Sequence, residues 1–253
     1  MSIKIENLSY AYEKNQVLCG INTTIHEGSL TALFGPNGSG KSTLFKCILG
    51  LCKGYGGKIY INGTDASLLN VRQKSKQIAY IPQTHNTVFG YSVLDMVIMG
   101  TAHQVSSLSS PSEKELRQAR AAMEKVGIEH LSGRSINRLS GGEQQLVLIA
   151  RALAQSAKIL LMDEPTSALD YGNQLLILRQ AEQLRNEGYT VLMSSHNPQH
   201  VMNHSDRTIA MFGGKIVADD VTESVLTPEL IQKLYGVKTI FSESEHGKSI
   251  MPL

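Results

Sequence analysis

The sequence predicts an α/β protein built on a mostly parallel sheet. Short apolar runs at residues 29–34, 158–163 and 189–195 are typical of strands that are buried on both faces. They alternate with segments of helical character, and such alternation favours parallel strand pairing. The first of these strands leads through a glycine-rich loop into a helix, which is the strand–loop–helix order of a phosphate-binding unit.

The N-terminal part of the chain has mainly strand character. Ile3, Ile5 and Leu8 lie on a mostly alternating segment, and residues 17–25 form a second strand candidate. The helix after the glycine-rich loop is expected over residues 43–51. A later strand at residues 58–61 is followed by Asn62-Gly63, which is a strong hairpin signal.

Helical character is expected from about residue 84. Ser110-Pro111, followed by Glu113, predicts an N-cap, a first-turn proline and an N3 glutamate, and Gly127 ends this helix. The remaining expected elements are helices at 141–154, 171–186 and 227–236 and strands at 158–163, 189–195, 206–212 and 215–218. The tail from residue 242 to 253 is polar and is expected to be loose.

Composition excludes several classes of function. The chain has 253 residues and a formal net charge of +2, which is too mild to indicate a nucleic-acid partner. Its three cysteines have no framework spacing and are expected to be free thiols. No apolar run approaches the roughly 18 residues that span a bilayer. If the protein moves a solute across a membrane, another chain must therefore supply the pore.

Residues 35–42 match the eight-residue phosphate-loop pattern at every fixed position. Glycines allow successive backbone N–H groups to turn inward and form an anion cradle, and the following helix directs its positive end at the phosphates. Lys41 is expected to reach the β- and γ-phosphates, and the Ser42 hydroxyl to bind Mg²⁺. The alternative is a glycine-rich turn with a chance lysine.

Two acids, Asp163 and Glu164, follow directly on the apolar run 159–162. The carboxyl end of a parallel sheet is where open α/β folds bind ligands. Asp163 is expected to hold Mg²⁺, directly or through water, and Glu164 to polarise the attacking water as a general base. A solvated helix start, with acids near the helix dipole, is the alternative.

His196 follows the strand at 189–193 and two serines, which places it at the carboxyl end of that strand. A histidine there can contact the γ-phosphate and stabilise charge in the transition state. His196, His200 and His204 are also spaced four apart, which raises the alternative of a metal site. A surface helix with scattered histidines explains the same spacing without a metal.

At this point the motifs resemble one family closely. Leu139-Ser140-Gly141-Gly142-Glu143 resembles the signature motif of ABC ATPases, and it lies between the phosphate loop and Asp163-Glu164 as in that family. Further motifs also resemble the family's: Gln83 the Q-loop, Ser167-Ala168-Leu169-Asp170 the D-loop, His196 the H-loop, and Tyr12, with Tyr10 as the alternative, the A-loop aromatic. Position 143 is Glu where the commonest form has Gln, a variant similar to some importer branches.

The resemblance covers residues 2–237 and implies one ABC ATPase domain over residues 1–237, followed by a polar tail at 238–253. It implies a P-loop NTPase core, an N-terminal antiparallel β subdomain and a helical signature subdomain at about 84–156. The cofactors implied are ATP and Mg²⁺.

The resemblance also assigns the site residues. The catalytic residues would be Glu164, His196, Gln83 and Lys41, and Mg²⁺ would be held by Ser42, Gln83 and Asp163. ATP would be bound by Tyr12, Gly35, Pro36, Asn37, Gly38, Ser39, Gly40, Lys41, Ser42 and Thr43, and in trans by Ser140, Gly141, Gly142 and Asp170 of a second copy. One chain would thus hold half of each site, and dimer closure on ATP would drive transport.

Residues 90–100 and the helix at 112–131 resemble the ATPases of metal-chelate importers, which take up siderophores, haem, cobalamin or related complexes. Arginine often follows the Met-Gly pair there, whereas this chain has Thr101. An amphipathic surface that contacts any coupling helix is the alternative. The expected partners are a second copy, two membrane permease subunits and, indirectly, a substrate-binding protein, at the cytoplasmic face of the inner membrane.

Four other interpretations remain open. The chain could serve another class of ABC transporter, or act on DNA or the ribosome, although residues 41–139 contain no coiled-coil insert and only one cassette is present. A small P-loop kinase would share the phosphate loop but lack the signature motif. A binding module without catalysis would not need Lys41, Asp163 and Glu164.

Overall fold

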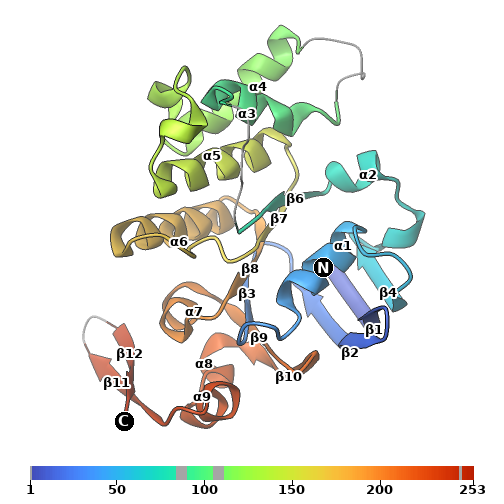
Figure 1. Ribbon diagram of the computed structural model, residues 1–253, viewed down its shortest axis with the longest axis vertical. Coiled ribbons are helices and arrows are strands. Elements are labelled where there is room, and N and C mark those ends of the chain that lie inside the picture. Colours follow the sequence, from blue (N-terminus) through green and yellow to red (C-terminus); the bar gives the residue numbers. More distant parts are fainter. Residues whose placement is uncertain (1, 84–89, 105–110, 245–246) are drawn as a thin grey trace. The chain divides into compact units, whose positions relative to one another are not determined.

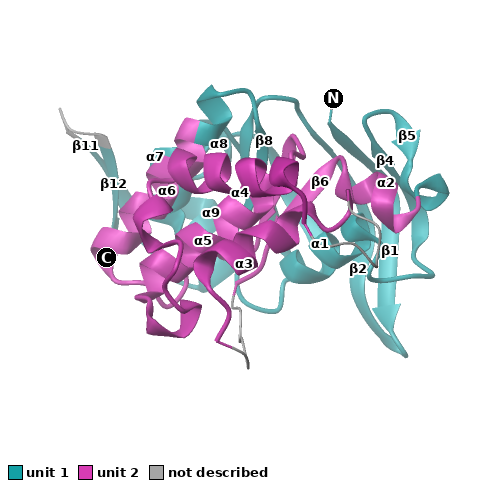
Figure 2. Ribbon diagram, turned by 90° about the horizontal axis from the view of Figure 1, so that it is seen from above, with its two compact units in different colours: residues 1–69, 184–253 teal, residues 70–183 magenta. Residues whose placement is uncertain are grey.

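The computed structural model describes residues 2–83, 90–104, 111–244 and 247–253 (Figure 1). The chain forms two compact units, coloured separately in Figure 2. Unit 1 comprises residues 1–69 and 184–253, and unit 2 comprises residues 70–183.

The N-terminal part of unit 1 is a four-stranded antiparallel sheet in the order β2-β1-β4-β5. Its strands are β1 (Ile3–Tyr12), β2 (Asn15–Ile25), β4 (Gly56–Ile61) and β5 (Thr64–Asp65). Asn62 and Gly63 both have positive φ angles, of 48° and 81°, as the predicted hairpin turn between β4 and β5 requires.

The second part of unit 1 contains the parallel strands β3 (Leu30–Phe34), β8 (Thr190–Ser195) and β9 (Arg207–Phe212), with β3 between the other two. All residues of β3 and β8 are buried, as their apolar sequences predict. The Gly213-Gly214 turn joins β9 to the antiparallel strand β10 (Lys215–Val221).

Short helices complete unit 1. They are α1 (Lys41–Leu49), the 3₁₀ turn η1 (Ala66–Leu68), α7 (Pro198–His204), α8 (Thr222–Val225) and α9 (Pro228–Tyr235). Apolar residues of α7, α8 and α9 pack with Ala32, Phe34 and Ala210 in one buried cluster. This packing fixes the segment after β8 against the strand that precedes the phosphate loop.

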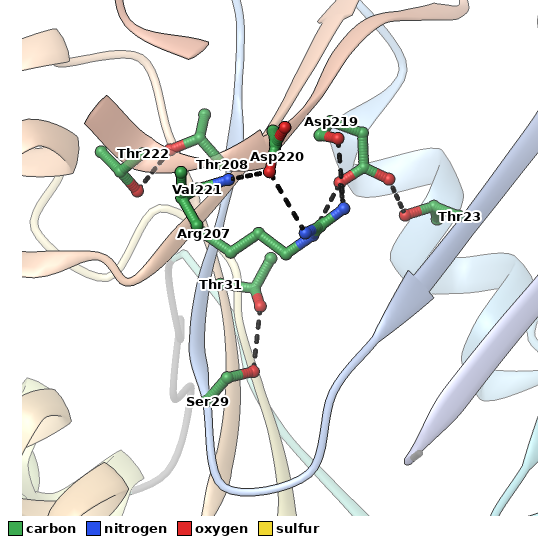
Figure 3. Close-up of polar contacts among 9 residues, drawn as sticks. All are labelled: Thr23, Ser29, Thr31, Arg207, Thr208, Asp219, Asp220, Val221 and Thr222. Atoms are coloured by element: carbon green, nitrogen blue, oxygen red, sulfur yellow. Dashed lines mark hydrogen bonds and ion pairs between the residues drawn. The ribbon is translucent and has the colours of Figure 1, made fainter. Parts of the chain in front are cut away.

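A polar network joins β2 to the β9–β10 hairpin within unit 1 (Figure 3). The Arg207 Nε donates to Asp219 Oδ1 over 2.9 Å, and the Thr23 hydroxyl donates to Asp219 Oδ2 over 2.7 Å. The side chains of Arg207 and Asp219 are only 25% and 19% exposed. A partly buried ion pair with further hydrogen bonds is worth more than an exposed pair.

Unit 2 contains a parallel pair of strands, β6 (Ile78–Ile81) and β7 (Ile159–Met162), and most of the helices. The helices are α2 (Val71–Ser75), α3 (Val93–Ile98), α4 (Glu113–Lys125), α5 (Gly141–Ala154) and α6 (Tyr171–Asn186), whose last residues belong to unit 1. Single 3₁₀ turns lie at η2 (Met99–Thr101), η3 (Glu129–Leu131) and η4 (Ile136–Arg138). None of the described helices in either unit is both long enough and apolar enough to cross a bilayer.

The predicted start of the helix now labelled α4 is wrong by two residues. Its N-cap is Ser112, whose side chain accepts from the Lys114 N–H, and Glu115 closes the capping box. Pro111 therefore precedes the helix rather than starting it, and Ser110 lies outside the described residues. The sequence Ser-Pro-Ser-Glu-Lys-Glu holds two overlapping capping patterns, and the second supplies both reciprocal hydrogen bonds.

The expectation of a loose C-terminal tail is also wrong. Strands β11 (Thr239–Ser244) and β12 (Gly247–Pro252) form an antiparallel hairpin. The Gln199 side chain of α7 holds β12, because its amide donates to the Lys248 carbonyl over 2.8 Å and accepts from the Ile250 N–H over 2.9 Å.

The helical stretch predicted from about residue 84 begins in the range 84–89, which lies outside the described residues. The strand β6, which precedes this range, was not predicted.

Candidate functional site

The phosphate loop of unit 1 connects β3 to α1. Gly35, Gly38 and Gly40 have φ angles of 155°, 80° and 104°, which L side chains rarely adopt. The Lys41 ammonium donates to the carbonyls of Gly35 and Pro36 over 2.8 and 3.1 Å, so its charge lies within the turn. The loop thus has the backbone conformation and the cation that an anion cradle needs.

Two glycines of this loop are required by close contacts. A Cβ at Gly35 would lie 2.2 Å from the Met211 carbonyl oxygen, and one at Gly40 would lie 2.9 Å from a Leu18 methyl carbon. The Ser39 hydroxyl is buried without a hydrogen-bond partner among the described residues. A phosphate oxygen is the kind of acceptor that would satisfy such a hydroxyl, so the loop fits a bound nucleotide.

His196 follows β8 at the same edge of the sheet at which the phosphate loop follows β3. In the parallel pairing of β3 with β8, Phe34 lies opposite Ser195, so Gly35 and His196 are the next residues of adjacent strands. The His196 ring is exposed, and its backbone carbonyl accepts from the Tyr235 hydroxyl over 3.0 Å. Asn197 caps α7 behind it. These contacts position His196 at the carboxyl end of β8.

Tyr12, the candidate adenine-stacking residue, lies near the end of α1. It is 43% exposed, and its hydroxyl lies 3.5 Å from the Cys52 sulfur. Tyr10 packs edge-on against it with ring centroids 5.0 Å apart, and its hydrogen bond with Cys52, together with burial, raises the pKa of Tyr10 to about 12. Both phenols are therefore neutral, and Tyr12 offers the more exposed aromatic face.

The acidic pair lies in unit 2, where β6 and β7 run parallel with Ile81 opposite Met162. Gln83 and the acids consequently follow the same edge of this strand pair. Asp163 is 3% exposed and accepts from the Tyr80 hydroxyl over 3.2 Å. The Gln83 amide donates to Glu164 Oε2 over 3.4 Å, and Glu164 has a φ angle of 45°. Such a backbone conformation costs free energy in a non-glycine residue, and active sites are one place where it recurs.

Ser140 is the N-cap of α5 and makes a complete capping box with Glu143. The Ser140 hydroxyl donates to the Glu143 carboxylate over 2.9 Å and accepts from the Glu143 N–H over 3.3 Å. These hydrogen bonds with the Ser140 backbone and hydroxyl hold the pKa of Glu143 below its ordinary value. Glutamate at position 143 therefore supports the helix start as a capping residue.

The segment after β7 contacts the start of α5 within unit 2. Asp170 accepts from the backbone N–H and the side-chain amide of Asn173, over 2.9 and 2.8 Å. The amide oxygen of Asn173 would lie 2.1 Å from a Cβ at Gly142. Gly142 thus allows Asn173 to remain paired with Asp170, which links two of the motifs named from the sequence.

Comparison with known proteins identifies the family. The profile described as ABC transporter matches residues 18–167. An ABC transporter ATP-binding protein of Haemophilus influenzae is 38% identical over 93% of this chain and 89% of its own length.

The chain belongs to the ABC transporter family. It is the ATP-binding cassette of such a transporter, and cassettes of this kind are ATPases that work with membrane permease components. A probable iron chelatin transport ATP-binding protein of Helicobacter pylori is 36% identical and covers 93% of both chains. An iron(3+)-hydroxamate import ATP-binding protein of Bacillus subtilis is 32% identical over 93% of this chain and 88% of its own length.

Solved cassettes have the same fold. A metal-chelate type ABC transporter in an inward-facing conformation matches 100% of this chain and 97% of its own with a TM-score of 0.87 and 29% identity. The ADP conformation of another ABC transporter cassette matches 91% of this chain and 97% of its own with a TM-score of 0.82 and 27% identity. The predicted α/β fold class and ABC ATPase family are confirmed.

Two polar contacts of the cassette were missed in the sequence. Tyr80 is not among the residues singled out from the sequence, yet its hydroxyl donates to Asp163. Asn173 lies three residues after Asp170, a capping spacing that could have indicated the contact. Of the three histidines at four-residue spacing, His200 is buried, its Nδ1 has no hydrogen-bond partner among the described residues, and burial lowers its pKa. The described residues contain no cluster of three His, Cys, Asp or Glu side chains arranged to hold a metal ion.

Proposed function

We propose that the protein is the ATP-hydrolysing subunit of an importer for metal or metal-chelate cargo. Transport would pass through separate membrane subunits, supplied with cargo by a substrate-binding protein. Relatives whose names include iron chelatin, iron(3+)-hydroxamate and manganese transport support this cargo class. The chain would act at the cytoplasmic face of the inner membrane.

The conformation of the phosphate loop is the main observation that supports the proposal of nucleotide binding. Positive-φ glycines and the enclosed Lys41 ammonium form a cationic turn at the start of α1. We assign the β- and γ-phosphates to residues 35–43, in which backbone N–H groups and Lys41 neutralise their charge. Tyr12 would stack on the base.

Asp163, Gln83 and Ser42 are the residues that we assign to Mg²⁺. They supply a carboxylate, an amide and a hydroxyl oxygen, which suit a hard cation. Mg²⁺ would neutralise charge on the phosphates when bound. The buried Asp163 is held by Tyr80, and the exposed Ser42 follows directly on Lys41.

Glu164 is the residue that we assign to activation of the attacking water. Its φ angle of 45° and the hydrogen bond from Gln83 hold the carboxylate in a defined position at the end of β7. A carboxylate can accept the proton of the water as the bond to the γ-phosphate forms. His196 would stabilise charge on the transferred phosphoryl group.

The signature segment would complete the site of a second copy of the chain. Ser140, Gly141 and Gly142 begin a 14-residue helix, and a helix N-terminus with small residues favours an anion close to its backbone N–H groups. Asp170 would lie in the same contact, since it is tied to Gly142 through Asn173. The motif therefore suits a role in trans, in a homodimer closed by ATP.

Replacement of Lys41 tests the nucleotide assignment. Lys41→Ala should abolish ATP hydrolysis and weaken ATP binding at least tenfold, because the only side-chain cation within the described turn is removed. Lys46→Ala, in the same helix but exposed, is the matched control and should retain wild-type turnover. Wild-type turnover of Lys41→Ala would contradict the assignment. The cargo is tested separately, by metal uptake in cells that carry the chain with its permease.

A further inference from the structure

Unit 2 contains a cavity of about 600 Å³ whose lining includes none of the residues assigned above. Three cations line it: Arg72 and Lys76 at α2, and Lys114 in the first turn of α4. The lining residues that the structure describes include no Asp or Glu. A concave site of this size, with charge of one sign, is suited to a small anionic group.

Two glutamines connect the segments that form the cavity wall. The Gln155 amide donates to the carbonyls of Ser75 and Ile78, over 2.6 Å in each case. The Gln118 amide donates to the Ala154 carbonyl over 2.9 Å and also to the Ser156 hydroxyl. The backbone that carries the cations is thus fixed before any ligand arrives, which lowers the entropic cost of binding.

Two of the charges in the wall repel each other. Arg72 and Lys76 lie one helical turn apart, a spacing at which like charges are unfavourable. Lys114 lies in the first turn of α4 together with Glu113 and Glu115, and neither of these acids lines the cavity. His103, also in the wall, is partly buried, and burial followed by the charges of Lys76 and Arg72 lowers its pKa.

We propose that this cavity binds a phosphate group, carried either by a soluble phosphorylated compound or by an anionic phospholipid. A doubly charged tetrahedral anion would relieve the repulsion between Arg72 and Lys76 and would also attract Lys114. Arginine and lysine are the residues that recognise phosphate in proteins, through forked hydrogen bonds and point charge respectively. Arg72, Lys76 and Lys114 are exposed, and they differ from an ordinary basic surface in surrounding one cavity whose described lining contains no acid.

Inorganic pyrophosphate tests the proposal with the full-length chain. The Lys41→Ala background removes the phosphate loop as a competing site, and the imidazole resonance of His103 reports on the cavity itself. Pyrophosphate should shift this resonance saturably and raise the pKa of His103, because the added negative charge favours the imidazolium in the presence of Arg72, Lys76 and Lys114.

Matched variants separate the cavity from general basicity. Arg72→Gln and Lys114→Gln should each weaken pyrophosphate binding at least fivefold, whereas Arg120→Gln, exposed on α4 outside the cavity lining, should leave it unchanged. All three positions are exposed, so the variants should fold normally, which melting curves can verify. No saturable shift of His103, or equal weakening by Arg120→Gln, would overturn binding of the soluble anion.

Vesicles distinguish the two sources of phosphate. Phosphatidylcholine vesicles with and without phosphatidylglycerol are sedimented with the full-length chain and its variants. Retention on phosphatidylglycerol that is lost in Lys114→Gln but kept in Arg120→Gln identifies a headgroup, whereas pyrophosphate binding without such retention identifies a soluble ligand. The proposal is overturned if neither probe shows a dependence on Arg72 and Lys114.

Discussion

At the residue scale, the proposed function depends on the backbone conformation of Gly35 and Glu164 and on the side-chain charge of Lys41. The glycine-rich pattern predicted the positive φ angles of the phosphate loop, because few other residues adopt them without strain. The unusual φ angle of Glu164 could not be predicted, since a non-glycine residue in this conformation depends on its surroundings. The role of Tyr80 was likewise invisible, because it depends on the pairing of β6 with β7.

Glu164→Gln tests the general base. The variant should hydrolyse ATP at least ~100-fold more slowly, because the amide cannot accept the proton of the attacking water. ATP affinity should persist, since Lys41 and the loop glycines are unchanged. Single-turnover hydrolysis and a nucleotide titration measure the two effects separately. Unchanged turnover would remove Glu164 from this role.

At the element scale, Glu143 can be tested as a capping residue of α5. At pH 7, Glu143→Gln should keep the hydrogen bonds of the capping box but lose the contribution of the charge, and it should cost less than Glu143→Ala, which should cost about 0.5–1.5 kcal/mol. The pKa of Glu143 is lowered from 4.5, so its contribution is present above about pH 4.5 and lost as the pH falls through the lower, folded-state pKa. Urea unfolding between pH 7 and pH 3 should show a larger loss of stability for wild type than for Glu143→Gln, because the other carboxylates titrate in both proteins.

The Arg207–Asp219 pair offers a second test at this scale. Asp219→Ala removes the carboxylate that the partly buried Arg207 shares with Thr23 and should reduce the free energy of unfolding by about 2–3 kcal/mol. Asp220→Ala is the control, because Asp220 is 65% exposed and 3.9 Å from Arg207, and should cost about 0–1 kcal/mol. Equal losses in urea unfolding would show that the network does not join β2 to the hairpin.

Helices and strands could be predicted where the sequence pattern that determines them lies within the element or directly beside it. The apolar runs of β3, β7 and β8 and the helix ends at Gly127 and Gly236 were predicted close to their observed places, whereas α1, expected over residues 43–51, begins at Lys41 and ends before Gly50. The hairpin β11–β12 was not, because its polar sequence is held by Gln199, some 49 residues from Lys248. Two capping patterns overlapped at the start of α4, and only the three-dimensional structure selects between them.

For the whole molecule, the motif order over nearly the full chain predicted the family correctly, as the match to residues 18–167 confirms. The identity of the cargo could not be predicted from this sequence, because the residues that would contact the cargo belong to other chains. The proposed role of residues 139–143 in trans belongs to this scale, since each site would need two copies. A site divided between copies makes activity depend on association.

The dependence of ATP turnover on protein concentration tests this central claim most directly. The turnover per molecule should rise with concentration of the full-length chain until it saturates, because only paired chains hold complete sites. Ser140→Arg should remain inactive at every concentration while binding ATP as a monomer. A turnover per molecule that is constant on dilution and unaffected by Ser140→Arg would contradict the account.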